Sequence, residues 1–579
     1  MKALVFNKKL SALFLYTSFL AILILILEHR FTPEIWVETL IQYFFEAFLL
    51  LGMTFTLLKI SYRRQTNKRL IIFDVVSICF IIFCLIKQHH LQHQYHIITE
   101  YLKAAIILKW VREMITQRVN YKRSVLNPAQ LFIISFLVII VIGTILLRLP
   151  QATHNGISLI DAVFMATSAV CVTGLTLFDL NSYFTQFGQT TILLLVQTGG
   201  LGILTFASYF AYFFKGGTTY ENQLALNDMS NNSKLGEVFT TLSRILIITF
   251  SIEIISAIFI FINIEKTFMP LLGDRIYFSI FHAISSFCNA GFSTVPQGMM
   301  KEEFVYNYPL QLIMICTFVM GGLGFPIIIN ILRYFKYFVK RYLLWFTSGE
   351  NNYRAWVMTL SSKINLITTF SLMIFGTVAF FALEYNNTLK DHDLVGKFVT
   401  AIFSATTPRS AGLNTIDFNS IHLSTLMIIV LLMWIGASPA STGGGIKTST
   451  FAIATLNFIS LAKGKSKIEL FRREVADISV RRAFATMTLS FIAIGTGVCL
   501  VAHFDGEFSI KDIIFECVSA YCTVGLSLGI TADLSEASKV VTILLMFTGR
   551  VTMLSILIAF FKKVRPMNYQ YPTDEIMIN

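Results

Sequence analysis

The chain has 579 residues, of which 55% are hydrophobic and only 14% are charged, with a formal net charge of +13. About a quarter of the residues of a soluble domain are charged, so this composition excludes a water-soluble globular protein. Apolar runs of roughly 18 residues or more recur along the chain, and each is long enough to span a bilayer. The excess of Lys and Arg is typical of cytoplasmic loops, and no nucleic-acid-binding module accompanies it. We therefore expect an all-α polytopic membrane protein with no nucleic-acid partner.

The first part of the chain holds several apolar segments separated by loops of different charge. These segments lie near residues 10–28, 39–60, 70–87 and 97–115. The loops 61–69 and 112–123 are strongly basic, so the positive-inside rule places them, together with the N-terminus, in the cytoplasm. We expect residues 1–125 to form an N-terminal membrane region of about four helices.

From residue 129 onward the sequence becomes periodic. Each period holds a long apolar run, a shorter amphipathic stretch, a short glycine segment and a second long apolar run. Such a period predicts one supersecondary unit repeated along the chain. We expect these units, called pore repeats 1 to 4, at 129–215, 239–335, 364–461 and 482–562, followed by a cytoplasmic tail at 563–579.

Basic stretches lie between the repeats and after the last one. Residues 333–346, 463–482 and 562–566 are rich in Lys and Arg. The positive-inside rule places these stretches in the cytoplasm, which turns every glycine segment toward the outside. We therefore expect a multi-pass protein of a prokaryotic plasma membrane with both termini in the cytoplasm.

The glycine segments have the sequences CVTGL, CNAGF, SAGLNT and CTVGL, around Gly174, Gly291, Gly412 and Gly525. The amphipathic stretches before them, such as 157–170, are too short to span, and non-helical backbone at membrane depth requires burial or a wet cavity. The C-terminal end of each short helix carries partial negative charge. Four such ends, followed by carbonyls that glycine allows to point the same way, favour a cation on a common axis.

At these residues the chain resembles the Trk/Ktr/HKT superfamily of potassium transporters, and most of all the ion-translocating subunits of the KtrB and TrkH type. The resemblance covers about residues 129–565 and implies four repeats of membrane helix, pore helix, filter and membrane helix around one pseudo-fourfold pore. It implies potassium uptake through a carbonyl-lined filter, with K⁺ as the transported ion, no organic cofactor and no enzymatic activity. The residues that it assigns to the K⁺ filter are Val172, Thr173, Gly174, Asn289, Ala290, Gly291, Ser410, Ala411, Gly412, Thr523, Val524 and Gly525.

Other interpretations of the glycine segments stay open. Small residues also let membrane helices pack closely, which would explain one or two segments but not four in register. Cys171, Cys288 and Cys522 precede three of the glycines and would suit a thiol enzyme, but His282 is the only histidine near them in sequence and no partner carboxylate is evident. We expect these cysteines to pack the pore helices behind the filter.

The transported ion has an alternative as well. Serine in place of the first filter glycine goes with sodium transport in plant members of the resembled family, whereas residue 174 here is glycine. The resemblance therefore implies potassium, with a sodium-conducting relative, or a sensor with a vestigial pore, as alternatives. Asp179, Asp417 and Asp533 follow three of the filters and either raise the local cation concentration or are ordinary solvated acids.

The second apolar run of repeat 3 contains GASPASTGGGIKTST at 436–450, which cannot hold a regular helix. The resemblance identifies it as an intramembrane loop that gates the pore below the filter. A basic residue facing the cavity would repel cations, although Arg550 would alternatively hold the fold together by pairing with helix ends or carbonyls. The expected gate residues are Gly436, Gly443, Gly444, Gly445, Lys447 and Arg550.

The N-terminal region departs from the resembled family, because KtrB-like proteins lack it and TrkH-like proteins carry only two extra helices. In its last segment, basic residues stand at several positions of a series with a spacing of three, and acidic residues lie in the neighbouring segments. The basic residues are Lys103, Lys109, Arg112 and Arg118, and the acids are Glu46 and Asp74. This pattern resembles a voltage-sensor domain, or else a helix whose cations reach the cytoplasmic face.

The loop 87–96 of the same region is rich in histidine. His89, His93 and His96 would share one helix face and either bind a metal or sense pH, or are incidental.

The resemblance also implies partners. The family's translocating subunits are homodimers in membrane lipid, and they bind a cytosolic ring of nucleotide-binding TrkA- or KtrA-like regulatory subunits. This chain has no P-loop, and GGLGIL and MGGLGF lack the strand–turn–helix context of a dinucleotide fingerprint. Nucleotide control would therefore come from a partner, for which residues 465–482 are a candidate docking surface.

Overall fold

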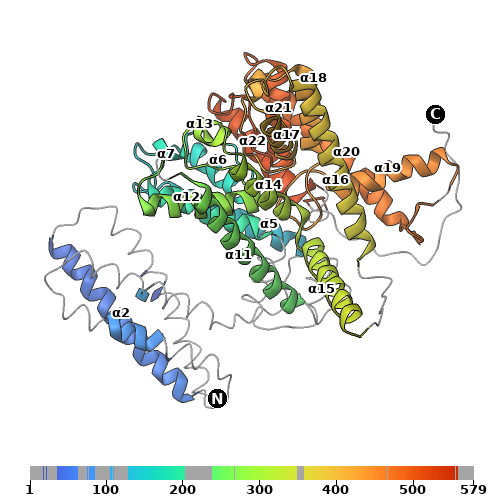
Figure 1. Cartoon of the computed structure of the whole chain (residues 1–579). Coiled ribbons are helices and arrows are strands. Elements are labelled where there is room, and N and C mark those ends of the chain that lie inside the picture. Colours follow the sequence, from blue (N-terminus) through green and yellow to red (C-terminus); the bar gives the residue numbers. More distant parts are fainter. Residues whose placement is uncertain are drawn as a thin grey trace, which may run out of the picture. The chain divides into compact units, whose positions relative to one another are not determined.

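The computed structural model describes residues 17–18, 21, 35–62, 75, 77–84, 105–106, 109, 128–202, 238–265, 268–348, 358–465, 467–553 and 556–557. Nearly every element in these ranges is a helix (Figure 1). The chain divides into two compact units, one drawn mainly from residues before Ser124 and the other mainly from residues after it.

The N-terminal unit contains α2 (Ile35–Tyr62) and a small apolar cluster. The buried members of this cluster are Ala21, Phe45, Phe48, Leu49, Ile81, Cys84, Ala105 and Ile106. Lys109 is buried beside α2, where its Nζ donates hydrogen bonds to the Gly52 carbonyl at 2.7 Å and the Thr56 hydroxyl at 2.6 Å. A Cβ on Gly52 would lie 2.6 Å from Lys109 Cε, so the missing side chain makes room for the lysine.

Most residues of the voltage-sensor and histidine hypotheses lie outside the described residues. They are Lys103, Arg112, Arg118, Asp74, His89, His93 and His96. Both hypotheses therefore stay predictions. Lys109 itself is enclosed by protein and does not extend its ammonium group to solvent.

The second unit holds similar sets of three helices: a first helix, a short pore helix and a second helix after the glycine segment. In repeat 1 these are α5 (Pro128–Leu147), α6 (Leu159–Val170) and α8 (Gln186–Gly200). In repeat 2 they are α11 (Val238–Asn263), α12 (Leu272–Cys288) and α14 (Tyr308–Leu323). Repeat 3 has α16 (Leu360–Glu384), α17 (Leu394–Thr406) and α18 (Leu423–Trp434), and repeat 4 has α20 (Asp477–Phe504), α21 (Ile510–Cys522) and α22 (Glu536–Val551).

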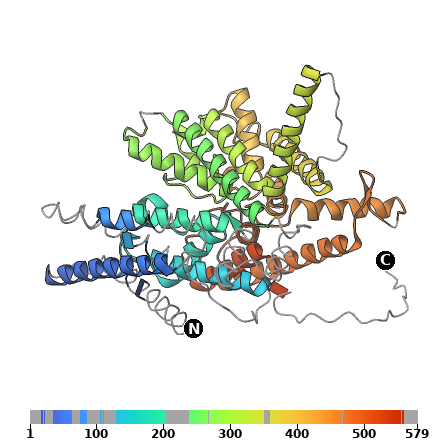
Figure 2. The same ribbon diagram turned by 90° about the horizontal axis from the view of Figure 1, so that it is seen from below.

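These sets pack in a closed cycle. The second helix of each repeat contacts the pore helix of the next repeat. The four contacts are α8 with α12, α14 with α17, α18 with α21, and α22 with α6. Because the last contact returns to repeat 1, a single chain encloses one centre, and the colours of the repeats follow this order around it in Figure 2.

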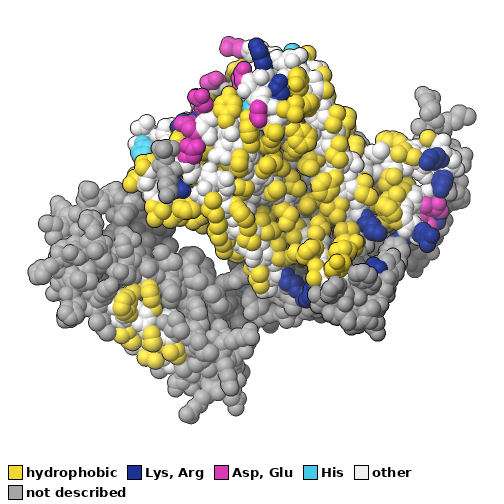
Figure 3. Space-filling view, viewed as in Figure 1, with side chains coloured by type: hydrophobic (Ala, Val, Ile, Leu, Met, Phe, Trp, Pro, Cys, Tyr) yellow, Lys and Arg dark blue, Asp and Glu magenta, His cyan; other side chains and the backbone are white. Residues whose placement is uncertain are grey.

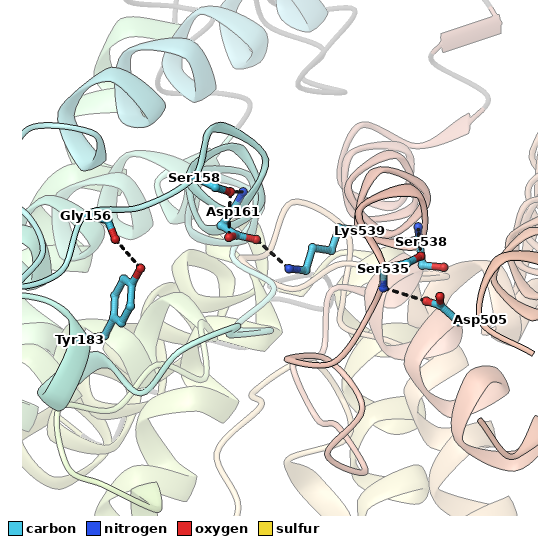
Figure 4. A network of polar contacts seen from close by, with 8 residues as sticks. All are labelled: Gly156, Ser158, Asp161, Tyr183, Asp505, Ser535, Ser538 and Lys539. Carbon is cyan, nitrogen blue, oxygen red and sulfur yellow. Dashed lines mark hydrogen bonds and ion pairs between the residues drawn. The ribbon is translucent and has the colours of Figure 1, made fainter. Parts of the chain in front are cut away.

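Polar side chains join the first and last repeats where the cycle closes (Figure 4). Lys539 Nζ of α22 lies 2.8 Å from Asp161 Oδ1 of α6, and the two side chains are only 14% and 17% exposed. The other oxygen of Asp161 accepts a hydrogen bond from Ser158, the N-cap of α6, at 2.8 Å. Asp505 accepts the backbone N–H of Ser535, the N-cap of α22, at 3.0 Å. The closure therefore combines an ion pair with capped helix ends.

Two of the second helices are interrupted. α14 and α15 (Phe325–Ser348) meet at Gly324, which has φ of 82°, and the two helices are bent by 106°. Pro326 lies in the first turn of α15, where a missing backbone N–H costs nothing. α18 ends at Trp434 and α19 (Thr448–Ala462) begins at Thr448, so residues 435–447 are not helical.

The surface of the second unit fits a membrane. Among the described residues, three helices are long and apolar enough to cross one, within α11, α16 and α20, and the bent pair of α14 and α15 passes the same test together. Exposed hydrophobic side chains cover much of the face in Figure 3. Most of the visible Asp and Glu side chains gather at its upper end, and many Lys and Arg side chains lie near α15 and α19. This charge asymmetry is typical of a membrane protein with a basic cytoplasmic side.

A small hairpin is the exception to the expected all-helical structure in the described part of the chain. β1 (Glu469–Leu470) and β2 (Arg473–Glu474) pair antiparallel. Their two connecting residues, Phe471 and Arg472, have φ of 50° and 61°. Positive φ at both turn residues is the pattern of a tight hairpin turn, which Asn and Gly usually occupy, so the sequence gives no clear sign of it.

Candidate functional site

Each glycine segment adopts the same backbone conformation. Gly174, Gly291, Gly412 and Gly525 have φ of 90°, 70°, 73° and 87°. Two positions earlier, Val172, Asn289, Ser410 and Thr523 have φ of 55°, 59°, 83° and 49°. Positive φ is rare outside glycine, and residues held in this region cluster at functional sites. Its recurrence at the same place in four distant segments indicates one specialised loop used four times.

The four glycines meet around a common centre. A Cβ on Gly174 would lie 3.2 Å from the Cα of Gly291, and one on Gly291 would lie 3.0 Å from the Cα of Gly412. A Cβ on Gly525 would lie 3.0 Å from the Cα of Gly174, and one on Gly412 would clash with the carbonyl oxygen of Val524. Any side chain in this ring would displace the backbone of a neighbouring repeat, so both space and φ require glycine.

Hydroxyl groups of the pore-helix ends hold three of the four loops from behind. Each donates a hydrogen bond to the carbonyl of the residue that directly follows the glycine. The pairs are Ser168 with Leu175 and Ser285 with Phe292, each at 2.7 Å, and Thr407 with Leu413. Ser519 occupies this place in repeat 4, and its hydroxyl has no hydrogen-bond partner among the described residues.

A cavity of about 340 Å³ opens on one side of the ring, and we call it the entrance cavity. Its lining includes the four glycines together with Thr176, Asp179, Ser293 and Asn414. Asp179 also accepts the backbone N–H of Asn181 at 2.7 Å. Asp417 accepts that of Asn419 at 2.9 Å, and neither Asp417 nor Asp533 lines the cavity. Of the three acids singled out by sequence, Asp179 is thus the one that lines the cavity beside the glycine ring.

The non-helical residues 435–447, which we call the intramembrane loop, lie against the other side of the ring. Gly444 donates its N–H to Ser410 Oγ at 3.0 Å, and a Cβ on Gly444 would clash with Thr523 Oγ1. Ser410 Oγ in turn donates to the Thr523 carbonyl at 3.0 Å. Both contacted residues precede their filter glycines, whereas residues that follow the glycines line the entrance cavity. The ring therefore separates the loop from the cavity.

Close packing fixes the path of the loop. A Cβ on Gly436 would clash with the Gly444 carbonyl, and one on Gly443 would lie 2.6 Å from Ala437 Cβ. Gly445 has φ of 67°, which favours glycine. The loop also donates from Ser438 N–H to the carbonyl of Gly322 in α14, at 3.0 Å. The loop is thus packed on repeat 2 as well as on its own glycines.

Two basic residues, the buried Arg550 and the half-buried Lys447 of the loop itself, donate hydrogen bonds to loop carbonyls. Arg550 of α22 donates to the carbonyl of Thr442 and, at 2.7 Å, to that of Gly199 in α8. Lys447 Nζ donates to the Gly443 carbonyl at 2.6 Å. Arg550 thereby ties the loop of repeat 3 to repeats 1 and 4. The contacts of Arg550 are those of a residue that holds backbone carbonyls together, and they also place the positive charge of Arg550 beside the loop.

Sequence reasoning did not single out Arg409, which immediately precedes Ser410 in the third glycine segment. Its side chain is 7% exposed and donates to the Thr369 carbonyl at 3.1 Å and the Gly436 carbonyl at 3.3 Å. It thus connects the third glycine segment to α16 and to the start of the intramembrane loop. A basic residue within TPRSAGLNTIDF, in a segment expected at membrane depth, was the available sign.

The cysteines of the glycine segments are buried at the ends of the pore helices. Cys171, Cys288 and Cys522 are each at most 1% exposed. His282 bonds to the Phe278 carbonyl and to Ser293, each at 2.9 Å, and not to Cys288. In the described part of the chain, the base–thiol contact that a cysteine enzyme needs is therefore missing.

The family model TrkH, described as a cation transport protein, matches residues 93–571. Ktr system potassium uptake protein B of Bacillus subtilis is 33% identical over 474 residues, which are 81% of this chain and 98% of that protein. Potassium/sodium uptake protein NtpJ of Enterococcus hirae is 33% identical over 467 residues, 79% of this chain and 98% of that protein.

A solved structure is similar as well. The potassium transporter TrkH from Vibrio parahaemolyticus superposes with a TM-score of 0.60 at 17% sequence identity, covering 86% of this chain and 99% of the other. This likeness concerns the fold alone, and it confirms the helical, polytopic class expected from the sequence.

Proposed function

The chain belongs to the TrkH family of cation transport proteins, and we propose that it is the ion-translocating subunit of a potassium uptake transporter. In this proposal K⁺ passes through the ring of filter glycines into the cell. The names of the Bacillus and Enterococcus relatives, which describe uptake of potassium and of potassium or sodium, support the substrate.

The ring of Gly174, Gly291, Gly412 and Gly525 is the observation that carries the proposal. Positive φ at each glycine and two positions before it lets successive carbonyls face the same side. Carbonyls arranged in this way replace the water shell of a cation. The proposed filter is Val172–Gly174, Asn289–Gly291, Ser410–Gly412 and Thr523–Gly525.

We further propose that the intramembrane loop and Arg550 form the gate, with Gly436, Gly443, Gly444, Gly445 and Lys447. The contacts of Gly444 with Ser410 and of Arg550 with Thr442 support this role, because a loop bonded to both cannot leave the ring without breaking them. An opening stimulus would have to release these bonds.

We propose a homodimer in the cell membrane that binds a cytosolic nucleotide-binding subunit of the TrkA or KtrA type. The name of the Bacillus relative describes it as part of a Ktr system. The exposed hairpin, with Lys467 and Glu474 paired at 2.7 Å, is the proposed docking surface because it lies in a basic stretch expected in the cytoplasm.

Uptake of ⁸⁶Rb⁺ and ²²Na⁺ into proteoliposomes that hold the chain tests the proposal. We expect the wild type to take up Rb⁺ in preference to Na⁺, and Gly174→Ser to reduce that preference about tenfold or more. A Cβ on Gly174 would clash with the Ala290 carbonyl oxygen, so a side chain there must move a carbonyl of the second filter.

Gly156→Ser is the matched control, because Gly156 has a similar φ of 77° but nothing within 4 Å of its Cβ position. It should leave the preference unchanged. Absence of Rb⁺ uptake by the wild type, even with a regulatory ring added, would contradict the proposed function.

A further inference from the structure

Two buried ionisable residues occupy the same place in the second and fourth pore helices. His282 precedes its filter glycine by 291 − 282 = 9 residues, and Glu516 precedes its own by 525 − 516 = 9 residues. His282 is 0% exposed and Glu516 is 1% exposed. Polar groups this deeply buried are costly unless they are hydrogen-bonded, so their partners identify what they do.

His282 bonds to the segment that follows the second filter. Its Nδ1 lies 2.9 Å from the Phe278 carbonyl, which can only accept, so Nδ1 carries the proton and donates. In the neutral ring Nε2 is then an acceptor, and it lies 2.9 Å from Ser293 Oγ. Ser293 stands two residues after Gly291 and lines the entrance cavity. The histidine thus holds, from behind, the residues that directly follow the second filter glycine, and we call such residues the rim of a filter.

Glu516 makes the corresponding contact in repeat 4. Its Oε2 accepts a hydrogen bond from Ser527 at 2.8 Å, and its Oε1 accepts one from Thr531 at 2.6 Å. Ser527 stands two residues after Gly525, as Ser293 does after Gly291. Ser527 Oγ also accepts the backbone N–H of Gly529 at 3.0 Å, which fixes the turn that follows. One carboxylate therefore anchors the fourth filter rim at two points.

Repeats 1 and 3 are built differently at this place. Met165 and Phe403 stand nine residues before their glycines, and both are buried apolar side chains. The order of contacts around the ring places repeat 2 between repeats 1 and 3, and repeat 4 on the opposite side. Hydrogen bonds thus brace the rim in two opposite repeats, whereas apolar side chains occupy the same helix position in the other two.

We propose that His282 and Glu516 are positioning residues that set the ion discrimination of the filter. The serine that each one holds is two residues from the ring glycine, so freeing the serine lets the filter strand shift. Carbonyl cages discriminate between cations by the number and placement of their oxygens, and a shifted strand changes both. Neither residue touches the ion itself, and the inference rests on the proposed function of the ring.

Concentration-dependent ⁸⁶Rb⁺ uptake with Na⁺ as competitor, in proteoliposomes of the full chain, tests this inference. We expect Glu516→Leu and His282→Leu each to raise the KM for Rb⁺ about fivefold or more, with a smaller change in maximal rate, and to lower the preference for Rb⁺ over Na⁺. Glu516→Gln and His282→Gln keep an acceptor for the serine hydroxyl and should stay within about twofold of the wild type.

Smaller substitutions provide a second test that remains valid if the leucine variants fail to fold. Ser527→Ala and Ser293→Ala remove only the hydroxyl, and each should reproduce the KM of the leucine variant in its repeat. Combining Ser527→Ala with Glu516→Leu should raise the KM by less than the product of the two single effects, because both variants break the bond between Ser527 and Glu516. Met165→Leu is the matched control at the same helix position in repeat 1 and should change nothing.

The outcomes separate the inference from the proposed function. If the wild type transports Rb⁺ and the serine variants match it in KM and in preference, the positioning role is wrong while the transport function stands. The same conclusion follows if the Gln variants are as impaired as the Leu variants, or if Met165→Leu is impaired as much. If the wild type transports neither ion, the proposed function is wrong and the positioning role is wrong with it.

Discussion

Glycine residues on the second helices lie directly against the carbonyl ends of the pore helices. A Cβ would clash with a carbonyl oxygen at each of these places: Gly199 against Val170, Gly321 against Phe287, and Gly549 against Tyr521. In each case the carbonyl belongs to the residue that directly precedes the buried cysteine of the glycine segment. Close packing by small residues, one interpretation of the filter segments, thus applies to these glycines of the second helices.

Gly549→Ala tests this packing at a single residue. Its methyl would overlap the Tyr521 carbonyl oxygen and lie 2.6 Å from the carbonyl carbon, so α22 must move away from α21. We expect the free energy of unfolding to fall by about 2 kcal/mol, seen as a lower thermal midpoint in detergent. Gly495→Ala is the control, because its Cβ would meet nothing within 4 Å. Equal midpoints for the two variants would contradict the packing argument.

At the scale of helices and loops, the sequence predicts where a helix is interrupted better than it predicts the angle between the two resulting helices. Gly324 and Pro326 indicate that a helix ends there, but the bend of 106° depends on contacts with repeat 3. A Cβ on Gly324 would lie 2.7 Å from the Pro439 carbonyl, and Phe325 donates its N–H to the Ala440 carbonyl at 3.4 Å. Contacts between residues more than a hundred positions apart leave no local pattern to recognise.

The candidate site also contains features that the sequence predicts and features that it does not. Glycine at four related positions points to a shared loop, because a side chain there would combine an unfavourable φ with a clash against the neighbouring repeat. Neither Arg409 nor Glu516 recurs as a residue type at its position in the other repeats, so their roles emerge only when their partners are known. The turn at Phe471 and Arg472 is equally hidden, since neither residue type is usual at positive φ.

Arg550→Gln tests the intramembrane loop as an element. The substitution removes the charge-assisted hydrogen bonds to the Thr442 and Gly199 carbonyls. We expect Rb⁺ flux without a regulatory partner to rise about threefold or more, because fewer bonds then hold the loop against the ring. Unchanged or lower flux in a folded variant would contradict the gate.

Arg275→Gln is the matched control for that variant. Arg275 is also buried and donates to two backbone carbonyls, those of Phe261 and Ile264, each at 3.2 Å. It lies on α12 away from the intramembrane loop, so its loss should lower stability without raising basal flux. A similar rise in both variants would mean that general loosening, and not the loop, controls the flux.

For the whole molecule, the decisive feature is that one chain must close its own ring. Three contacts between repeats join neighbours in sequence, but α22 with α6 joins the ends of the pore unit. This closure brings together residues far apart in the chain, so it carries the largest entropic cost of loop closure. Its stability therefore depends on specific contacts, and the Lys539–Asp161 pair is the ionic one shown in Figure 4.

Lys539→Met tests whether this pair stabilises the closed ring. Removing the cation leaves Asp161 largely buried beside Ser158 without its charge partner, so we expect a loss of about 1–3 kcal/mol of unfolding free energy. The double variant with Asp161→Asn should lose less than the sum of the single variants, because no unpaired charge then remains. Lys465→Gln is the control, since the Lys465–Glu469 pair is more than half exposed and should contribute little. Thermal unfolding in detergent compares these four variants with the wild type, and strictly additive losses would show that the pair does not act as a unit in closing the ring.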